Sequence, residues 1–196
     1  EEMFVYRMRS VLDPKAPKPS IETLLRAFLP AKHVYHANAD AICALTDTQN
    51  SRKVIKEVFG PSVALVDYTR PGFQLSKWVA EVYQKTPGLA AIILDKHGLI
   101  TWGETAKAAY ETTIKMVSTA ERYTAGVLKG KNVLGPLKVK ALPLKKRRAV
   151  AAEIAPVLRG EVSRGKRMLL LYEDDPTLLR FIGSAKAKDL TQVGPF

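Results

Sequence analysis

The side chains best suited to metal chemistry in this sequence are its three histidines, His33, His36 and His97. Imidazole is a common ligand for divalent ions, and its protonation changes near neutral pH. His36 ends a short run that favours a strand, and His97 precedes a glycine in a predicted hairpin turn. Both positions also suit a histidine without a metal, with His97 on the surface and His36 half-buried, so the pattern alone leaves both interpretations open.

Strand alternation separates the two upstream histidines. Side chains two residues apart on an extended chain project to the same side, so His36 and Asn38 share one side and His33 takes the other. If one side of this strand binds a metal ion, we expect it to be the side of His36 and Asn38. His33 is then predicted to have a structural role.

Glu22 lies in the sequence Ser20-Ile21-Glu22-Thr23, ahead of an apolar stretch that favours a helix over residues 21–28 with Ser20 as its N-cap. A glutamate in the first turn of a helix is stabilised by the helix dipole, and taken alone this position indicates only that role. The sequence has no glycine-rich phosphate loop, no Gly-x-Ser-x-Gly elbow and no Cys-x-x-Cys pair.

The elements that must position these residues alternate between short strands and helices. Apolar runs bounded by turn residues predict strands over 33–36, 62–68, 89–94, 99–103 and 167–172. Helical spacing predicts helices over 21–28, 39–45, 49–59, 73–85, 104–128, 149–155 and 176–181, the helix at 149–155 ending near Pro156. We expect an extended lead-in over residues 1–19, a linker over 131–145 and irregular structure over 184–196.

The composition fits one sizeable core, or one core plus an appendage. The chain has 196 residues, of which 46% are hydrophobic and 26% charged. No apolar run approaches the ~18 residues of a membrane helix, and no signal peptide is visible, so no membrane association is expected. Cys43 is the only cysteine, which fits a reducing, cytoplasmic location, and its apolar surroundings predict a buried inert thiol.

The net charge of +12 is concentrated in the last third of the chain. Residues 138–148 hold six basic side chains and no acidic one. Residues 130–170 contain no Trp, Tyr or Phe on which bases could stack, which argues against nucleic acid. A solvated linker or helix face is the preferred interpretation of the basic run, with steering of anionic substrates or a partner domain as the alternatives.

Three segments, in their order and spacing, resemble the class II aldolase and adducin family: residues 19–25 (PSIETLL), 33–40 (HVYHANAD) and 95–103 (DKHGLITWG). The resemblance covers residues 15–130 and is closest to the aldolase domain of bifunctional rhamnulose-1-phosphate aldolase/short-chain dehydrogenase proteins. It implies an α/β fold, the class II aldolase-like α/β/α sandwich with a central mixed or antiparallel sheet.

The resemblance also implies a two-part organisation. Residues 1–130 are expected to form the aldolase-like domain, without the N-terminal stretch in which the family binds phosphate. Residues 131–196 resemble the connector that precedes the dehydrogenase domain, and we expect a basic linker followed by a helix-strand-helix unit. No dinucleotide-binding fingerprint follows in this sequence.

Position by position, the resemblance assigns roles to five residues. Glu22 becomes the carboxylate that moves the carbon-bound proton, and His36 and His97 become metal ligands. Asn38 stands where the family has its remaining histidine ligand, and Ser20 falls at a substrate- or phosphate-binding position.

This sequence departs from the family pattern at the metal site. Asn38 replaces an imidazole with an amide oxygen, a harder ligand that suits magnesium or manganese better than zinc. Tyr35 stands in place of a family aspartate, and Arg26 in place of a further histidine. The implied cofactor is therefore Zn²⁺ or another divalent cation such as Mg²⁺ or Mn²⁺, bound less tightly than by three histidines.

The implied activity is a metal-dependent aldolase that cleaves a ketose 1-phosphate, such as rhamnulose 1-phosphate, to dihydroxyacetone phosphate and an aldehyde. The alternative is a non-catalytic, adducin-like module on the same fold, and a third possibility is a related epimerase or decarboxylase. The expected partners are a phosphorylated sugar, further copies of the chain in a homo-oligomer, and a fused or associated short-chain dehydrogenase.

Overall fold

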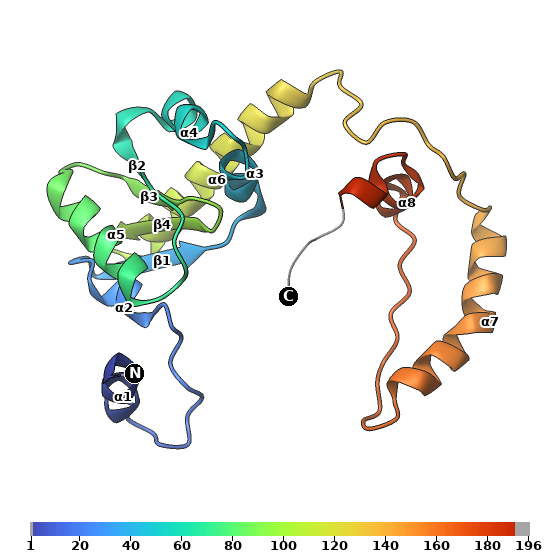
Figure 1. Cartoon of the computed structure of the whole chain (residues 1–196), viewed down its shortest axis with the longest axis horizontal. Helices are drawn as coiled ribbons and strands as arrows, with labels where there is room; N and C mark the ends of the chain where they lie inside the picture. Colours follow the sequence, from blue (N-terminus) through green and yellow to red (C-terminus); the bar gives the residue numbers. More distant parts are fainter. Residues whose placement is uncertain (1, 191–196) are drawn as a thin grey trace. The chain divides into compact units, whose positions relative to one another are not determined.

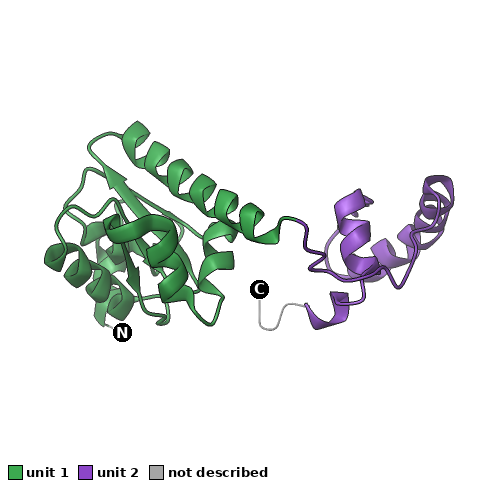
Figure 2. Cartoon of the chain, turned by 90° about the horizontal axis from the view of Figure 1, so that it is seen from above, with its two compact units in different colours: residues 1–129 green, residues 130–196 purple. Residues whose placement is uncertain are grey.

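The computed structural model describes residues 2–190. They fall into two compact units on either side of the bond between Lys129 and Gly130 (Figure 2). None of the described helices combines the length and the apolar character needed to cross a membrane.

A four-stranded sheet forms the centre of the first unit (Figure 1). In chain order its strands are β1 (His33–Ala37), β2 (Val63–Val66), β3 (Ala91–Leu94) and β4 (Gly98–Gly103), arranged β1-β4-β3-β2 across the sheet. β4 runs antiparallel to both β1 and β3, whereas β2 runs parallel to β3. The sheet is therefore mixed, as the resemblance implies.

Helices cover both faces of this sheet. In chain order they are α2 (Thr23–Ala27), α3 (Asp40–Thr46), α4 (Ser51–Phe59), α5 (Phe73–Lys85) and α6 (Ala106–Leu128), with a 3-10 turn at Gly60–Ser62. A further helix, α1 (Glu2–Arg9), precedes them in the chain and buries no side chain. Because side chains alternate along a strand, Ala91 and Ile93 pack with residues of α3, α4 and α6, while Ile92 and Leu94 pack with residues of α2 and α5. The two cores confirm the predicted α/β/α sandwich.

The packing of α6 on β4 depends on small and polar side chains. A Cβ on Gly103 would lie 2.8 Å from the backbone nitrogen of Ala109, so only glycine allows this approach. The buried Thr101 hydroxyl donates to the carbonyl oxygen of Ala109 (3.1 Å) and lies 2.6 Å from the hydroxyl of Thr113. These interactions fix α6 against the face opposite α2.

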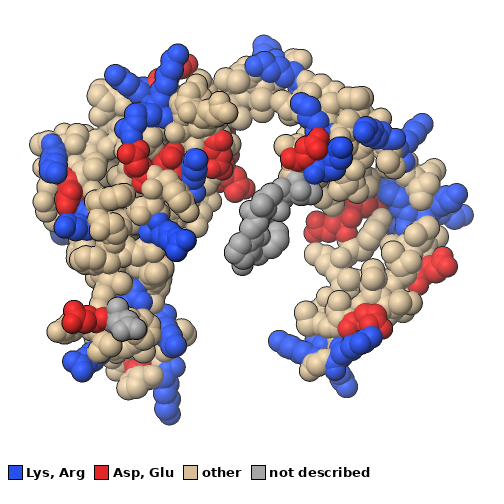
Figure 3. Space-filling model, viewed as in Figure 1, with Lys and Arg blue, Asp and Glu red and all other residues tan. Residues whose placement is uncertain are grey.

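The second unit contains α7 (Leu144–Val162), α8 (Pro176–Gly183) and a 3-10 turn at Ala187–Asp189. Asp175 caps α8 by accepting from the backbone N–H of Thr177, and Pro176 takes the first helical position, as predicted. Among the described residues of this unit no hydrophobic side chain is buried. The basic run of residues 138–148 ends in the first turns of α7, and Figure 3 shows Lys and Arg side chains spread along this unit.

Three predicted elements are wrong. Residues 1–19 are not wholly extended, because Glu2–Arg9 form α1, a helix of eight residues that buries no side chain. α7 is much longer than 149–155 and continues through Pro156, which lacks an amide hydrogen but leaves the other helical bonds in place. Residues 167–172 form no strand, since no described segment pairs with them.

Two boundaries also differ from the sequence-based expectation. α2 begins at Thr23 rather than at residue 21, because Ser20 accepts a hydrogen bond from the N–H of Glu22 (3.2 Å) in a turn before the helix. Within 184–196, the residues Ala187–Asp189 form a regular 3-10 turn, and Ser184 bridges to Leu137. Residues 191–196 lie outside the described part of the chain.

Candidate metal site

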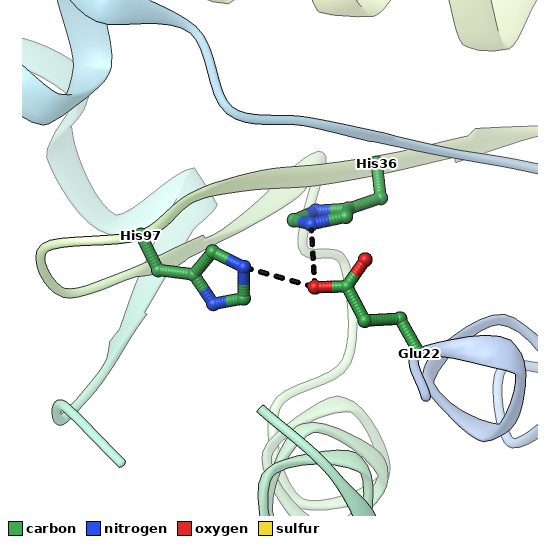
Figure 4. A group of neighbouring side chains, drawn as sticks. All are labelled: Glu22, His36 and His97. Carbon is green, nitrogen blue, oxygen red and sulfur yellow. Dashed lines mark ion pairs between the residues drawn. The ribbon is translucent and has the colours of Figure 1, made fainter. Parts of the chain in front are cut away.

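Three polar side chains from separate elements of the first unit point toward one another (Figure 4). Glu22 precedes α2, His36 lies near the end of β1, and His97 lies in the turn between β3 and β4. The Glu22 Oε1 atom is 3.3 Å from His36 Nε2 and 3.0 Å from His97 Nε2. The two imidazole rings are 5.0 Å apart at their centroids and nearly perpendicular.

The strand pairing brings the two histidines together. In the antiparallel pair of β1 and β4, Ala37 lies opposite Leu99, so the end of β1 meets the start of β4. Gly98 permits this approach, because a Cβ there would lie 2.3 Å from the carbonyl oxygen of Ala37. The turn before it contains Lys96 in the left-handed region (φ 55°) and carries His97 back over the sheet.

The face of the sheet on which His36 lies explains the position of Glu22. Val34, two residues before His36, packs in the core beneath α2 and α5, so His36 projects to the face that α2 covers. Glu22, at the start of α2, is therefore above the same face. His33 is exposed and lies on the opposite side of the strand, as alternation predicts, and takes no part in the cluster.

The cluster is well shielded from solvent. The side chains of His36, His97 and Glu22 are only 4%, 12% and 18% exposed. Burial lowers the pKa of His97; the nearby His36 lowers it further, and Glu22 acts in the opposite direction. His97 is thereby biased toward the neutral form, which is the form that binds a metal ion.

The hydrogen bonding of His36 leaves one ring nitrogen without a partner. His36 Nδ1 is 3.0 Å from the carbonyl oxygen of Leu99, which can only accept, so Nδ1 carries the hydrogen and donates. Nε2 faces the Glu22 carboxylate at 3.3 Å, and it has no hydrogen-bond partner among the described residues. A proton or a metal cation between the two atoms would satisfy both.

The spacing of the three donors fits a divalent ion. Zinc bonds of about 2.0–2.1 Å in a tetrahedron put neighbouring ligand atoms about 3.3 Å apart. The measured separations from Glu22 Oε1 are 3.3 and 3.0 Å, and all three ligand atoms lie within 4.8 Å of one another. Two imidazole nitrogens and a carboxylate oxygen also form a donor set that suits zinc and other divalent transition metals.

The other two predicted site residues lie beside the cluster. Asn38 is exposed and its backbone lies close to Gly98; among the described residues no hydrogen bond joins its side chain to the three donors. The hydroxyl of Ser20 accepts from the N–H of Glu22, and its carbonyl accepts from Arg7 (2.7 Å) and Thr23 (2.6 Å). Ser20 therefore shapes the turn that presents Glu22, and the predicted ligand roles of Asn38 and Ser20 stay predictions.

Two supporting interactions escaped sequence analysis because they involve backbone atoms. The carbonyl of Leu99 orients His36, and the thiol of Cys43 lies 3.5 Å from the carbonyl of His97. Cys43 is partly exposed rather than fully buried. Burial, with Asp47 and Asp40 nearby, raises the pKa of its thiol, which favours the protonated form. The inertness of this thiol stays a prediction.

Comparison with known proteins gives a family match that includes the whole cluster. The family described as "Class II Aldolase and Adducin N-terminal domain" matches residues 1–124. The chain is also 41% identical over 194 residues to the "Uncharacterized oxidoreductase YuxG" of Bacillus subtilis (strain 168). That alignment includes 99% of this chain but 28% of the longer protein, so the chain spans well under half of this relative.

Solved structures support the fold. The N-terminal class II aldolase domain of a conserved protein from Thermoplasma acidophilum is 42% identical, with a TM-score of 0.58 over 62% of this chain and 56% of that one. A sugar-phosphate aldolase from Thermotoga maritima is 18% identical, with a TM-score of 0.52 over 60% of this chain and 58% of that one. The second likeness concerns the fold alone.

Proposed function

This chain belongs to the class II aldolase and adducin family, and from that premise we propose that its first unit is a divalent-metal-dependent aldolase domain. The proposed reaction cleaves a ketose 1-phosphate to dihydroxyacetone phosphate and an aldehyde. Rhamnulose 1-phosphate, which would yield lactaldehyde, is the substrate that we favour. The observation that carries the proposal is the shielded carboxylate of Glu22, held within 3.3 Å of two imidazole nitrogens.

Each residue of the cluster has a distinct role in this proposal. His36 and His97 would hold the ion, which when bound supplies a Lewis acid that stabilises negative charge developing on a substrate oxygen. Glu22 transfers the proton at the carbon next to the carbonyl, where the electron pair of the broken carbon–carbon bond is left. Its side chain is 18% exposed, more than either imidazole, so it lies on the solvent side from which a substrate must arrive.

Metal binding and product formation test the proposal together. We expect the purified chain to bind one divalent ion and to release dihydroxyacetone phosphate from rhamnulose 1-phosphate, measured by a coupled assay. His97→Ala should abolish metal binding, whereas His33→Ala, which changes an exposed histidine outside the cluster, should leave it intact. Glu22→Gln should lower turnover by about 10²–10⁴-fold while both histidines still bind metal. Metal binding that survives His97→Ala would refute the site.

Asn38 favours one rival function. An exposed amide where the family has a histidine weakens metal binding, and a non-catalytic, adducin-like module would tolerate that loss. We expect metal affinity clearly below that of a three-histidine site, and nanomolar zinc binding would contradict this. Asn38→His should tighten metal binding if the chain is a working aldolase scaffold, and should change nothing if the scaffold has been recruited for another purpose.

The remaining parts of the proposal concern partners and products. The alignment with a longer protein described as an oxidoreductase supports a fused or associated short-chain dehydrogenase that acts on the aldehyde product. Adding the products to such a dehydrogenase with a nicotinamide cofactor should give reduced cofactor in proportion to the ketose cleaved. An epimerase or a decarboxylase would give an isomer or carbon dioxide instead, which product analysis by NMR distinguishes.

A further inference from the structure

The second unit contains a short stretch of chain with an unusual order of charges. Residues 166–174, here called the leucine segment, read Lys-Arg-Met-Leu-Leu-Leu-Tyr-Glu-Asp. Two basic residues begin the segment and two acidic residues end it, with five largely apolar residues between them. If a second copy of the segment runs in the opposite direction, its acidic end therefore lies opposite the basic end of the first copy, with Leu170 at the centre.

Two hydrogen bonds attach the leucine segment to α7, one near each end. At one end the Met168 carbonyl accepts from Arg159 (3.1 Å), and at the other Asp174 accepts from Arg147 (3.1 Å). The two arginines are separated by about 18 Å of helix at ~1.5 Å per residue. The six steps along the chain from Met168 to Asp174 would cover this length at about 3 Å each, close to the rise of a β-strand. Figure 1 shows the segment running back alongside α7.

The segment has the free hydrogen-bonding groups of an edge strand. Within the described part of the chain, no hydrogen bond involves the backbone N–H or carbonyl groups of residues 169–174. Its apolar side chains alternate in exposure: Leu169 and Leu171 are 95% and 81% exposed, whereas Leu170 is 47% exposed. Leu170 and Tyr172, together with part of Leu169, line a hollow against α7. Such an edge is a template for pairing with another strand.

We propose that the leucine segment binds a second copy of itself, as an antiparallel pair centred on Leu170. In this register Leu169 lies opposite Leu171 of the other copy, and Arg167 lies opposite Glu173. These residues all lie on the outer face of the segment, so four leucines come together with an ion pair at each end. A parallel pair would place like charges opposite each other instead. The two copies of α7 then cover the inner face, on which Leu170 lies.

The proposed interface is independent of the metal site and goes beyond the proposed function. Arg167 and Glu173 are exposed, and among the described residues neither forms an ion pair, so both are available for a partner. Because the apolar face alone could bind any strand, the charge order is what singles out a second copy. The interface would link second units whatever assembly the first unit forms.

Charge reversal tests the pairing in the whole 196-residue chain. We expect wild-type protein to self-associate in analytical ultracentrifugation, and Arg167→Glu or Glu173→Lys to raise the dissociation constant at least tenfold. The double variant restores opposite charges and should associate like the wild type, as should an equimolar mixture of the two single variants. A double variant as defective as either single variant would overturn the antiparallel register. If charge reversal has no effect on the association of the whole chain, the proposal is overturned. The leucine segment would then be a binding site for a strand of another protein.

A cross-link checks the register directly. In a Cys43→Ala background, Leu170→Cys places the two cysteines opposite each other and should form a disulfide-linked dimer under mild oxidation. Leu169→Cys is the matched control, because its partner position is Leu171 and it should cross-link far more slowly. Equal yields from the two variants would contradict the proposed centre, and circular dichroism would show that both are folded.

Discussion

Gly98→Ala tests whether the close approach of β1 and β4 is what places His97 beside His36. The alanine Cβ would lie 2.3 Å from the carbonyl oxygen of Ala37 and 3.0 Å from the α-carbon of Asn38. Both neighbours are backbone atoms, which cannot rotate away as a side chain could. The two strands must therefore separate at this end, and His97, the residue just before Gly98, must move with them.

The size of the effect follows from that distance. A carbon and a carbonyl oxygen that touch lie about 3.3 Å apart, so the strands must separate by about 1 Å. Losing one or two ladder bonds at ~1 kcal/mol each, together with residual strain, gives a destabilisation of about 2–3 kcal/mol. A shift of about 1 Å also exceeds the ~0.2 Å tolerance of a metal–ligand bond. We therefore expect metal affinity to fall about 10- to 100-fold, as when other groups that orient a ligand are removed.

Two measurements and one control decide the outcome. Urea unfolding gives the stability of the metal-free protein, and titration with a divalent ion gives the affinity. Gly126→Ala is the matched control, because Gly126 lies within α6 and nothing lies within 4 Å of the added Cβ. This variant should be unchanged in affinity and more stable by about 0.5–1 kcal/mol. If Gly98→Ala unfolds and binds metal like the wild type, the strand approach does not position His97.

Other parts of the structure support three further predictions. Thr101→Val removes a buried hydroxyl that donates to a carbonyl of α6 and touches Thr113, so it should lower the free energy of unfolding by about 1–3 kcal/mol in urea. Burial lowers the pKa of His97 below 6.5, so the unfolded state binds more protons in that range. The metal-free protein should therefore lose stability as the pH falls from about 6.5 through the lowered pKa, and His97→Gln should reduce this dependence. Pro156→Ala restores an amide donor within α7 at a position where proline costs about 3 kcal/mol, so amide exchange in that helix should slow.

The elements whose apolar residues recur at a regular spacing, between clear turn residues, could be predicted well from the sequence. α5 was predicted with its observed bounds, because Leu75 and Val79 recur at helical spacing and both are buried. The hairpin of β3 and β4 was predicted from an apolar run followed by a turn. α1 is a helix of only eight residues, and α7 contains Pro156, a residue that usually ends a helix, so the sequence pattern predicted neither helix in full.

The leucine segment shows a different limit of sequence analysis. Its composition is typical of a strand, but a strand is defined by a partner, and no described segment pairs with it. The pattern therefore predicted a strand at residues 167–172 that the described chain does not form. The local preference of a segment for an extended conformation does not determine whether another strand lies beside it.

The site itself depends on the order of strands, which local patterns do not contain. His36 and His97 approach each other only because β4, rather than β2, pairs with β1, and because the Ala37–Leu99 register aligns their ends. Strand alternation then directs His36 to the face that α2 covers, and Glu22 lies at the start of α2. One pairing thus places all three donors. A shift of one residue in that register would turn His36 to the α6 face and separate it from Glu22, even though the sequence of every element would be unchanged.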